Sequence, residues 1–201
     1  MNIRVIAERL DSSSLMNGSG GLTEITIIID DAGSGDLLFG VVIGAYQNES
    51  QEFKYDVIDV QYFQPPKFGK KEYLKQTSKI LFIILGKLRF EPDEPIMICR
   101  SHLFDEVFDK LTQLYGANRI RRVKVTGEPQ RLTELAYLDE VRNLGYEPLT
   151  NREEKRAKSF FNMLRWLKKN PEKVKYAKTG WPRLSRYRMF REIAGNVRNR
   201  K

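Results

Sequence analysis

Residues 25–35 read ITIIIDDAGSG, a run of β-branched residues followed by two aspartates and a glycine-rich turn. β-branched side chains favour strands, and a continuous apolar run is typical of a strand buried on both faces. Glycine supplies the backbone conformations that a sharp turn needs. Glu24 to Asp30 are therefore predicted to form a buried strand that brings Asp30 and Asp31 to one edge of a sheet.

The segments on either side of this strand predict an α/β fold. Strands are expected over 2–8, 37–46 and 53–63, and the short turns between the last two and the 24–30 strand favour an antiparallel meander. Helical spacing follows over 71–89, then a strand over 96–99, a helix from Ser101 to Tyr115, a strand over 119–126 and a helix over 131–144. Ser101 is a plausible N-cap, and Gly116 and Gly145 are placed to end the last two helices. This order predicts a mixed sheet with helices on both faces.

The length and charge of the chain indicate one domain with an appendage. Three parts are expected: a strand and flexible connector over 1–22, a core over 23–150, and an extension over 151–201 with a helix at about 152–168. The extension holds 17 Lys or Arg and 4 Asp or Glu, a net charge of +13, whereas the first 150 residues carry −4. Such a basic segment is attracted to polyanions, with nucleic acid as the first candidate.

Composition excludes several classes of protein. One cysteine, Cys99, permits no intramolecular disulfide, and with a single histidine, His102, it argues against a Cys/His zinc site. The longest apolar run, over 80–88, is interrupted by Lys87 and is too short to span a membrane. The first ten residues carry Arg4, Glu8 and Arg9, unlike a secretion signal. We expect a cytoplasmic location and no membrane partner.

The acidic turn resembles a known motif. Ile29-Asp30-Asp31-Ala32-Gly33-Ser34-Gly35, followed by Gly40-Val41-Val42-Ile43-Gly44, is similar to the first motif of type II ribonucleases H, where a strand ends in Asp-Glu-Ala-Gly-Arg-Gly. The order of elements also resembles the ribonuclease-H-like fold. The resemblance implies a divalent-metal-dependent nuclease, with Mg²⁺ or Mn²⁺ held by Asp30 and Asp31. Asp31 stands where the family has Glu, and Ser34 where it has Arg.

The chemistry of the turn is consistent with a cation site. Two adjacent carboxylates repel each other, and their oxygens suit Mg²⁺ or Mn²⁺. Strand geometry sends Asp30 and Asp31 to opposite faces, so both can serve one site only if the chain twists there. The alternative is a purely structural turn, since Asp binds its own backbone and Gly supplies positive φ.

Nucleases of the ribonuclease-H-like type use a further carboxylate near the end of the fourth strand, where this chain reads Ile98-Cys99-Arg100-Ser101-His102. Other acids are therefore candidates for the catalytic set, namely Glu72, Glu134, Asp139 and Glu140. Glu134 and Asp139 are five residues apart on a helix and cannot both face the sheet. His102 is a candidate proton shuttle or weak ligand, or a structural residue. Cys99 is most simply a buried small hydrophobe.

The basic extension interleaves rings with cationic side chains. Basic groups can contact phosphates while rings stack on bases. The candidate nucleic-acid-binding residues are Lys173, Lys175, Lys178, Arg183, Arg186, Arg188 and Arg191. The alternative is an amphipathic segment whose rings pack on the domain while the arginine stems cover apolar surface.

Three functions remain open from the sequence. The first is a metal-dependent nuclease or nucleic-acid-processing protein. The second is a non-catalytic nucleic-acid-binding or scaffolding protein that keeps the fold without a complete acidic site. The third is an ATP-binding relative of the actin and sugar-kinase superfamily, whose phosphate loop is similar to Asp31-Ala32-Gly33-Ser34, although such proteins are much longer than 201 residues.

Overall fold

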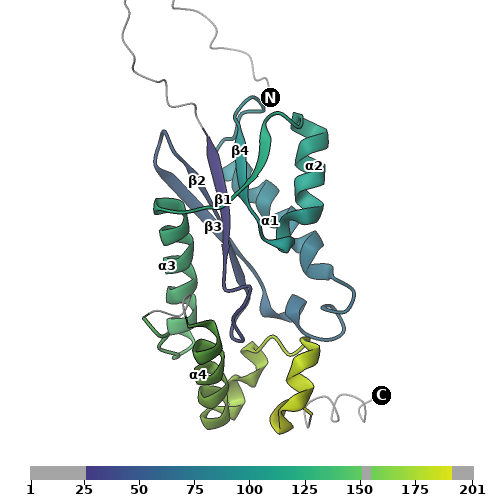
Figure 1. Cartoon of the computed structure of the whole chain (residues 1–201), viewed down its shortest axis with the longest axis vertical. Coiled ribbons are helices and arrows are strands. Elements are labelled where there is room, and N and C mark those ends of the chain that lie inside the picture. The colour runs from purple at the N-terminus through teal and green to yellow at the C-terminus, as the bar shows by residue number, and fades with distance from the viewer. Residues whose placement is uncertain (1–25, 151–154, 192–201) are drawn as a thin grey trace, which may run out of the picture.

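A computed structural model describes residues 26–150 and 155–191 and contains a mixed five-stranded sheet (Figure 1). The sheet order is β3-β2-β1-β4-β5. Neighbours β3, β2 and β1 run antiparallel, whereas β4 and β5 run parallel to β1. The strands are β1 (Ile27–Ala32), β2 (Val41–Gln47), β3 (Glu52–Ile58), β4 (Ile96–Cys99) and β5 (Ile120–Val123).

Helices cover both faces of this sheet. Helix α1 (Glu72–Lys87) packs against β2 and β3, and α2 (Asp105–Tyr115) packs beside α1 and β5 on the same face. Helix α3 (Glu128–Asn143) crosses the opposite face over β1 and β2 (Figure 1). The predicted α/β class is confirmed, and the strand order with parallel β1, β4 and β5 is consistent with a ribonuclease-H-like fold.

Side chains of β1 enter the cores on both faces of the sheet. Ile27 and Ile29 are fully buried in the core beneath α1 and α2. Ala32 joins Val42 and Tyr137 in a second core beneath α3. Because successive strand residues point to opposite faces, β1 is apolar on both sides, as its continuous β-branched run predicted.

Several predicted boundaries shift because of long-range contacts. The strand expected from Leu37 begins only at Val41, since Leu38 instead forms an isolated bridge to Ala177 of the extension. The strand expected to reach Phe63 ends at Ile58, and a 3-10 turn (Val60–Phe63) follows. Ser101 caps a 3-10 turn (His102–Phe104) that leads directly into α2, and Gly116 ends α2 as predicted. The strand and flexible connector expected over 1–22 lie outside the described residues.

The basic extension packs onto the α3 side of the domain. It contains α4 (Arg156–Lys169) and two 3-10 segments (Pro171–Tyr176 and Pro182–Arg186). Leu167, Leu184 and Phe190 are buried in the α3-side core. The packing predicted as the alternative for the rings and apolar residues is therefore present. No helix of the described residues is long and apolar enough to cross a membrane.

Candidate metal and phosphate site

The carboxyl ends of β1 and β4 lie side by side. The parallel register pairs Ile29 with Ile98, so Asp30 and Cys99 come next on the two strands. In sheets with parallel strands, ligand sites form outside these carboxyl ends. The register therefore places Asp30, Asp31 and Cys99 at the edge where such a site is expected.

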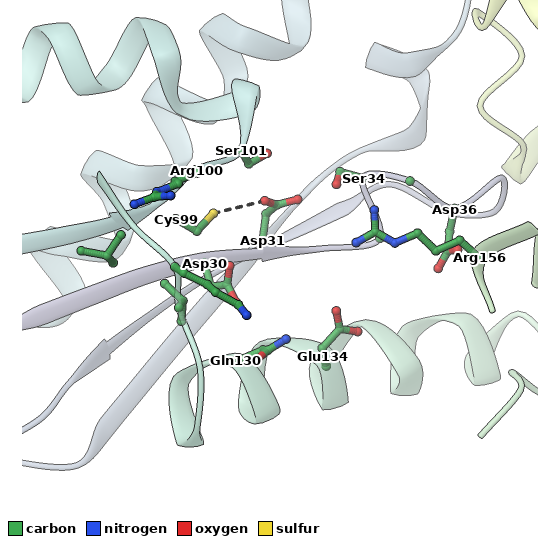
Figure 2. A pocket seen from close by; sticks show the side chains of 15 residues that line it. Asp30, Asp31, Ser34, Asp36, Cys99, Arg100, Ser101, Gln130, Glu134 and Arg156 are labelled. Atoms are coloured by element: carbon green, nitrogen blue, oxygen red, sulfur yellow. Dashed lines mark hydrogen bonds between the residues drawn. The ribbon is translucent and has the colours of Figure 1, made fainter. Parts of the chain in front are cut away.

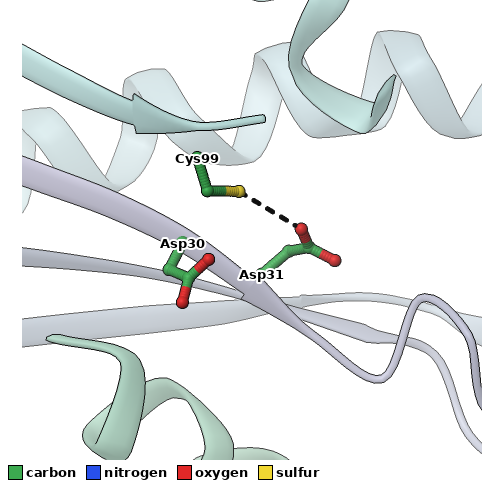
Figure 3. Close-up of side chains that lie close together, drawn as sticks. All are labelled: Asp30, Asp31 and Cys99. Atoms are coloured by element: carbon green, nitrogen blue, oxygen red, sulfur yellow. Dashed lines mark hydrogen bonds between the residues drawn. The ribbon is translucent and has the colours of Figure 1, made fainter. Parts of the chain in front are cut away.

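Asp30 and Asp31 leave β1 in different directions but remain close (Figure 3). Ligand atoms of Asp30, Asp31 and Cys99 all lie within 4.8 Å of one another. The thiol of Cys99 donates to Oδ1 of Asp31 across 3.4 Å. The strand itself continues to Ala32, so the sharp twist expected after Asp31 is not what brings the groups together. Instead β4 stops at Cys99, which leaves the edge of β1 open for both carboxylates to reach one space.

The surroundings of Cys99 keep its thiol protonated. The side chain is 7% exposed. Burial, and then the charges of Asp31 and Asp30, raise the pKa of Cys99 far above its usual range. The sequence identified Cys99 only as a small buried hydrophobe, yet its sulfur lies at the centre of the acidic group. Its contact with Asp31 is the S–H···O type of hydrogen bond.

An open cleft of about 590 Å³ surrounds the acidic group (Figure 2). Its floor is the edge of β1 and β4, and α3 forms one wall with Gln130 and Glu134. These two residues are four apart and so share one face of the helix. Glu134 and Asp36 thus add two further carboxylates to the cleft lining, one from a helix and one from the loop after β1, and neither from the fourth strand.

Three basic side chains also line the cleft. Arg100 directly follows β4, Lys124 directly follows β5, and Arg156 lies in the first turn of α4. The Arg156 side chain reaches back toward the loop after β1 (Figure 2). A cleft with acids on its floor and cations along its walls can hold a metal ion and the phosphate bound to it at once.

None of these three cations was among the predicted site residues. Arg100 and Lys124 could have been predicted, because each lies near the carboxyl end of a predicted strand and the carboxyl ends of neighbouring parallel strands meet at one edge of a sheet. Arg156 could not have been predicted, since its position depends on how α4 packs against the domain.

The other predicted acids lie elsewhere. Glu72, at the start of α1, does not line the cleft. Asp139 is exposed and pairs with Arg142, as expected for a residue that cannot share the sheet-facing side with Glu134. Glu140 is also outside the cleft lining. The structure thus brings Asp30 and Asp31 together, places Glu134 in the same cleft, and leaves the other predicted acids outside it.

The loop after β1 is held from beneath by Lys178. This side chain is 0% exposed. Its Nζ donates to the carbonyl oxygens of Gly33, at 2.5 Å, and Asp36, at 2.8 Å. Lys178 was predicted to bind nucleic acid at the surface, but its ammonium is buried against this loop, so we do not include it in a nucleic-acid surface.

Gly33 is required by the geometry of the same loop. Its φ is +87°, and a Cβ there would lie 2.1 Å from the ring of Tyr137. Tyr137 is fully buried, and its hydroxyl donates to the carbonyl of Leu38 at 3.0 Å. Burial, and then the charge of Asp36, raise the pKa of Tyr137 well above its usual range. The turn predicted around Gly33 therefore closes directly over α3.

The remaining basic candidates lie on the surface of the extension. Lys175, Arg183, Arg186, Arg188 and Arg191 are exposed, and Lys173 is partly buried. Lys173 and Lys175 both lie over the ring of Tyr176. Arg183 lines a second hollow, which His102 also lines. His102 is exposed there and lies outside the acidic cleft, which places it away from the proposed cation.

The acidic group fits a divalent cation in its dimensions and donors. Oxygen ligands of one octahedral Mg²⁺ lie no more than about 4.2 Å apart. The ligand atoms here lie within 4.8 Å of one another, so small side-chain rotations would bring them within that range. The carboxylates of Asp30 and Asp31 suit Mg²⁺ or Mn²⁺, whereas the sulfur of Cys99 is a soft donor that Mg²⁺ avoids. The oxygen donors of the group are therefore the two carboxylates, since the thiol of Cys99 keeps its proton and donates it to Asp31.

Comparison with known proteins adds no relative. No protein-family model matches the chain, and no curated protein matches its sequence.

Proposed function

We propose that this protein is a divalent-metal-dependent nuclease, or a nucleic-acid-processing protein, of ribonuclease-H-like fold. One observation carries the proposal: Asp30, Asp31 and Glu134 share a cleft whose walls carry Arg100, Lys124 and Arg156. Carboxylates alone would repel a phosphate, and basic side chains alone would bind it without cleaving the phosphodiester. The combination fits a phosphodiester bound through a metal ion.

Each group has a distinct part in this proposal. Asp30 and Asp31 hold the cation, which when bound activates water and stabilises the leaving oxygen. Glu134, across the cleft on α3, orients the attacking water or completes the acidic set. Arg100, Lys124 and Arg156 bind phosphate oxygens on either side of the reacting group. Arg186 and the other exposed cations of the extension contact the polymer farther away.

The test is cleavage of labelled single-stranded RNA and DNA with Mn²⁺, Mg²⁺ or EDTA. Cleavage with Mn²⁺ that is lost with EDTA and in Asp30→Asn supports the proposal. Asp139→Asn is the matched control, because Asp139 is an exposed acid that pairs with Arg142 outside the cleft. Mn²⁺ binding measured by calorimetry should also be lost in Asp30→Asn and kept in Asp139→Asn. A protein that neither binds Mn²⁺ nor cleaves either polymer would contradict the proposal.

The phosphate-binding part is tested separately on α4. Arg156 lines the cleft, whereas Arg165 on the same helix hydrogen-bonds to Asn162 on the exterior. Arg156→Gln should weaken oligonucleotide binding and raise KM, and Arg165→Gln should leave both near their original values. Equal effects of the two substitutions would mean that only the overall positive charge of α4 matters.

A non-catalytic nucleic-acid-binding protein is the second candidate. It is favoured by Cys99, which stands at the end of β4 where a nuclease of this fold would place a carboxylate. In that case oligonucleotides bind without metal, nothing is cleaved, and Asp30→Asn does not weaken binding. ATP-dependent thermal stabilisation would instead favour the nucleotide-binding alternative.

A further inference from the structure

A second hollow, of about 390 Å³, adjoins the acidic cleft. Ser34 and Gly35, at the tip of the loop after β1, line both spaces, so this loop is their common edge. The hollow lies between the start of α1 and the extension near Trp181. Its volume falls within the range of about 300–1,000 Å³ that is typical of small-molecule sites.

Aromatic rings form one wall of this hollow. Tyr73 stacks between Phe63 and Phe68, with ring centroids 5.5 and 5.4 Å apart and planes inclined by 22° and 21°. Phe63 is held by the domain core, so the wall is fixed rather than adaptable. Stacked, nearly parallel rings present flat faces and edges that favour another flat ring.

Trp181 lies on the side formed by the extension. The guanidinium of Arg183 stacks over its indole at 4.5 Å from the ring centroid. Trp181 is only partly buried, and Arg183 is exposed. An arginine stacked on a tryptophan at the rim offers both a π-face and a positive charge, the pair that proteins use to hold bases of single strands.

The charge around the hollow matches a polyanion. None of the described residues that line it is acidic, and the lining includes the cationic Arg183. Arg100 and Arg156 line the adjoining cleft beyond Gly35. A chain of phosphates could therefore run past the common edge while a neutral ring enters the apolar space.

We propose that this hollow binds one unstacked base of a single-stranded nucleic acid whose phosphate lies in the acidic cleft. The inference rests on the proposed function in that a nucleic acid enters the cleft. A base in a duplex is stacked and paired, so its entry requires a single strand or an extruded base. The site would thus make the protein prefer single-stranded over double-stranded polymer.

The test follows the fluorescence of Trp181 during binding in EDTA, where no cleavage occurs. The chain has two tryptophans, and Trp166 packs against Tyr146 away from this hollow, so Trp166→Phe leaves Trp181 as the sole reporter. The ligands are a short oligothymidylate, the same strand in duplex form, and an abasic strand of equal length. We expect the oligothymidylate to quench Trp181 and to bind at least about fivefold more tightly than the abasic strand, the lower end of what one stacked base contributes.

Two substitutions sharpen the test. Trp181→Leu should weaken binding of oligothymidylate but not of the abasic strand, and Trp181→Phe should restore most of the loss. Gly35→Leu adds a side chain at the common edge, where a Cβ meets no atom within 4 Å, and should weaken binding of oligothymidylate without harming the fold. Circular dichroism melting checks that each variant is folded.

The outcomes separate this inference from the proposed function. Equal affinity for abasic strand and oligothymidylate, or unchanged binding in folded Trp181→Leu, would overturn the base site even if Mn²⁺-dependent cleavage occurs. Base-dependent quenching with no cleavage under any metal would support the base site and contradict the nuclease proposal. Tighter binding of the duplex than of the single strand would also overturn the base site.

Discussion

At the scale of single residues, the loop after β1 contrasts two glycines that look alike in sequence. Gly33 has positive φ and lies against Tyr137, whereas Gly35 has open space around it. Gly33→Ala should lower the free energy of unfolding by more than about 2 kcal/mol, because strain and overlap with the ring add together. Gly35→Ala should change it by less than about 0.5 kcal/mol, like an ordinary surface substitution. Urea unfolding of the two variants checks the contrast, and equal losses would contradict it.

Cys99 lies where a third carboxylate would strengthen the proposed cation site. Cys99→Asp would place a third carboxylate beside Asp30 and Asp31, where the thiol now donates to Asp31. Without metal, like charges in a poorly solvated position should lower the melting temperature. With Mg²⁺, the added oxygen donor should raise it again, because hard cations prefer oxygen ligands. Melting curves with and without Mg²⁺ measure both effects, and Cys99→Ser is the control that removes sulfur without adding charge.

An absence of any Mg²⁺-dependent stabilisation in folded Cys99→Asp would argue that Asp30 and Asp31 do not converge on one cation. That result would also weaken the nuclease proposal, since the proposal needs both carboxylates at the same ion.

At the scale of secondary-structure elements, the extension is hydrogen-bonded to the loop after β1 and to the residues that follow it. The amide of Phe39 donates to the carbonyl of Tyr176 at 2.7 Å, and the amide of Lys178 donates to the carbonyl of Leu37 at 2.9 Å. The ammonium of Lys178 then reaches Gly33 and Asp36. The position of the loop after β1 therefore depends on residues more than a hundred positions away in the sequence.

Removing this attachment should loosen the loop. Lys178→Met leaves the buried carbonyl of Asp36 without this donor, while the carbonyl of Gly33 keeps the amide of Asp36. The expected loss is about 1–3 kcal/mol in the free energy of unfolding. Lys175→Met, at an exposed position three residues earlier, should have little effect. Hydrogen exchange at Gly33–Asp36 should quicken in Lys178→Met alone, and unchanged exchange would show that the loop does not need the ammonium.

The elements also show what local patterns can and cannot predict. The spacing of apolar residues predicted α1 and β4 nearly to the residue, because each is set by neighbours in sequence. The acids Asp30 and Asp31 were found because they follow a buried strand. Lys178 looked like a surface cation, since nothing near it in sequence reveals carbonyls 142 and 145 positions away. Arg156 was missed for the same reason.

At the scale of the whole molecule, the two cores differ in the ionisable groups that they bury. The core beneath α1 and α2 buries the phenol of Tyr73, whose pKa is raised by burial alone. The core beneath α3 and the extension also buries the phenols of Tyr137 and Tyr146, close to Asp36. Since the acidic cleft borders this second core, ionisation there affects the stability of the side that carries the site.

The pH dependence of unfolding should report on this second core. Burial, and then the charge of Asp36, raise the pKa of Tyr146 to about 12, and an unfolded tyrosine titrates near about 10. Below a pH of about 10 the phenol of Tyr146 is protonated in both the folded and the unfolded state, and its full contribution to stability is present. Between about pH 10 and 12 the unfolded state loses this proton before the folded state does. The free energy of unfolding should therefore fall as pH rises through this window, by at most about 2–3 kcal/mol from Tyr146.

Tyr146→Phe isolates that contribution, because the buried Tyr146 hydroxyl has no hydrogen-bond partner among the described residues. The variant should be as stable as the natural protein at neutral pH, or more so, since an unpaired buried hydroxyl costs free energy. Urea unfolding at several pH values from neutral to alkaline should show the two proteins diverging only above pH of about 10, with the variant losing less. Parallel curves over the whole range would mean that Tyr146 ionises alike in both states and that this core opens to water before its phenols titrate.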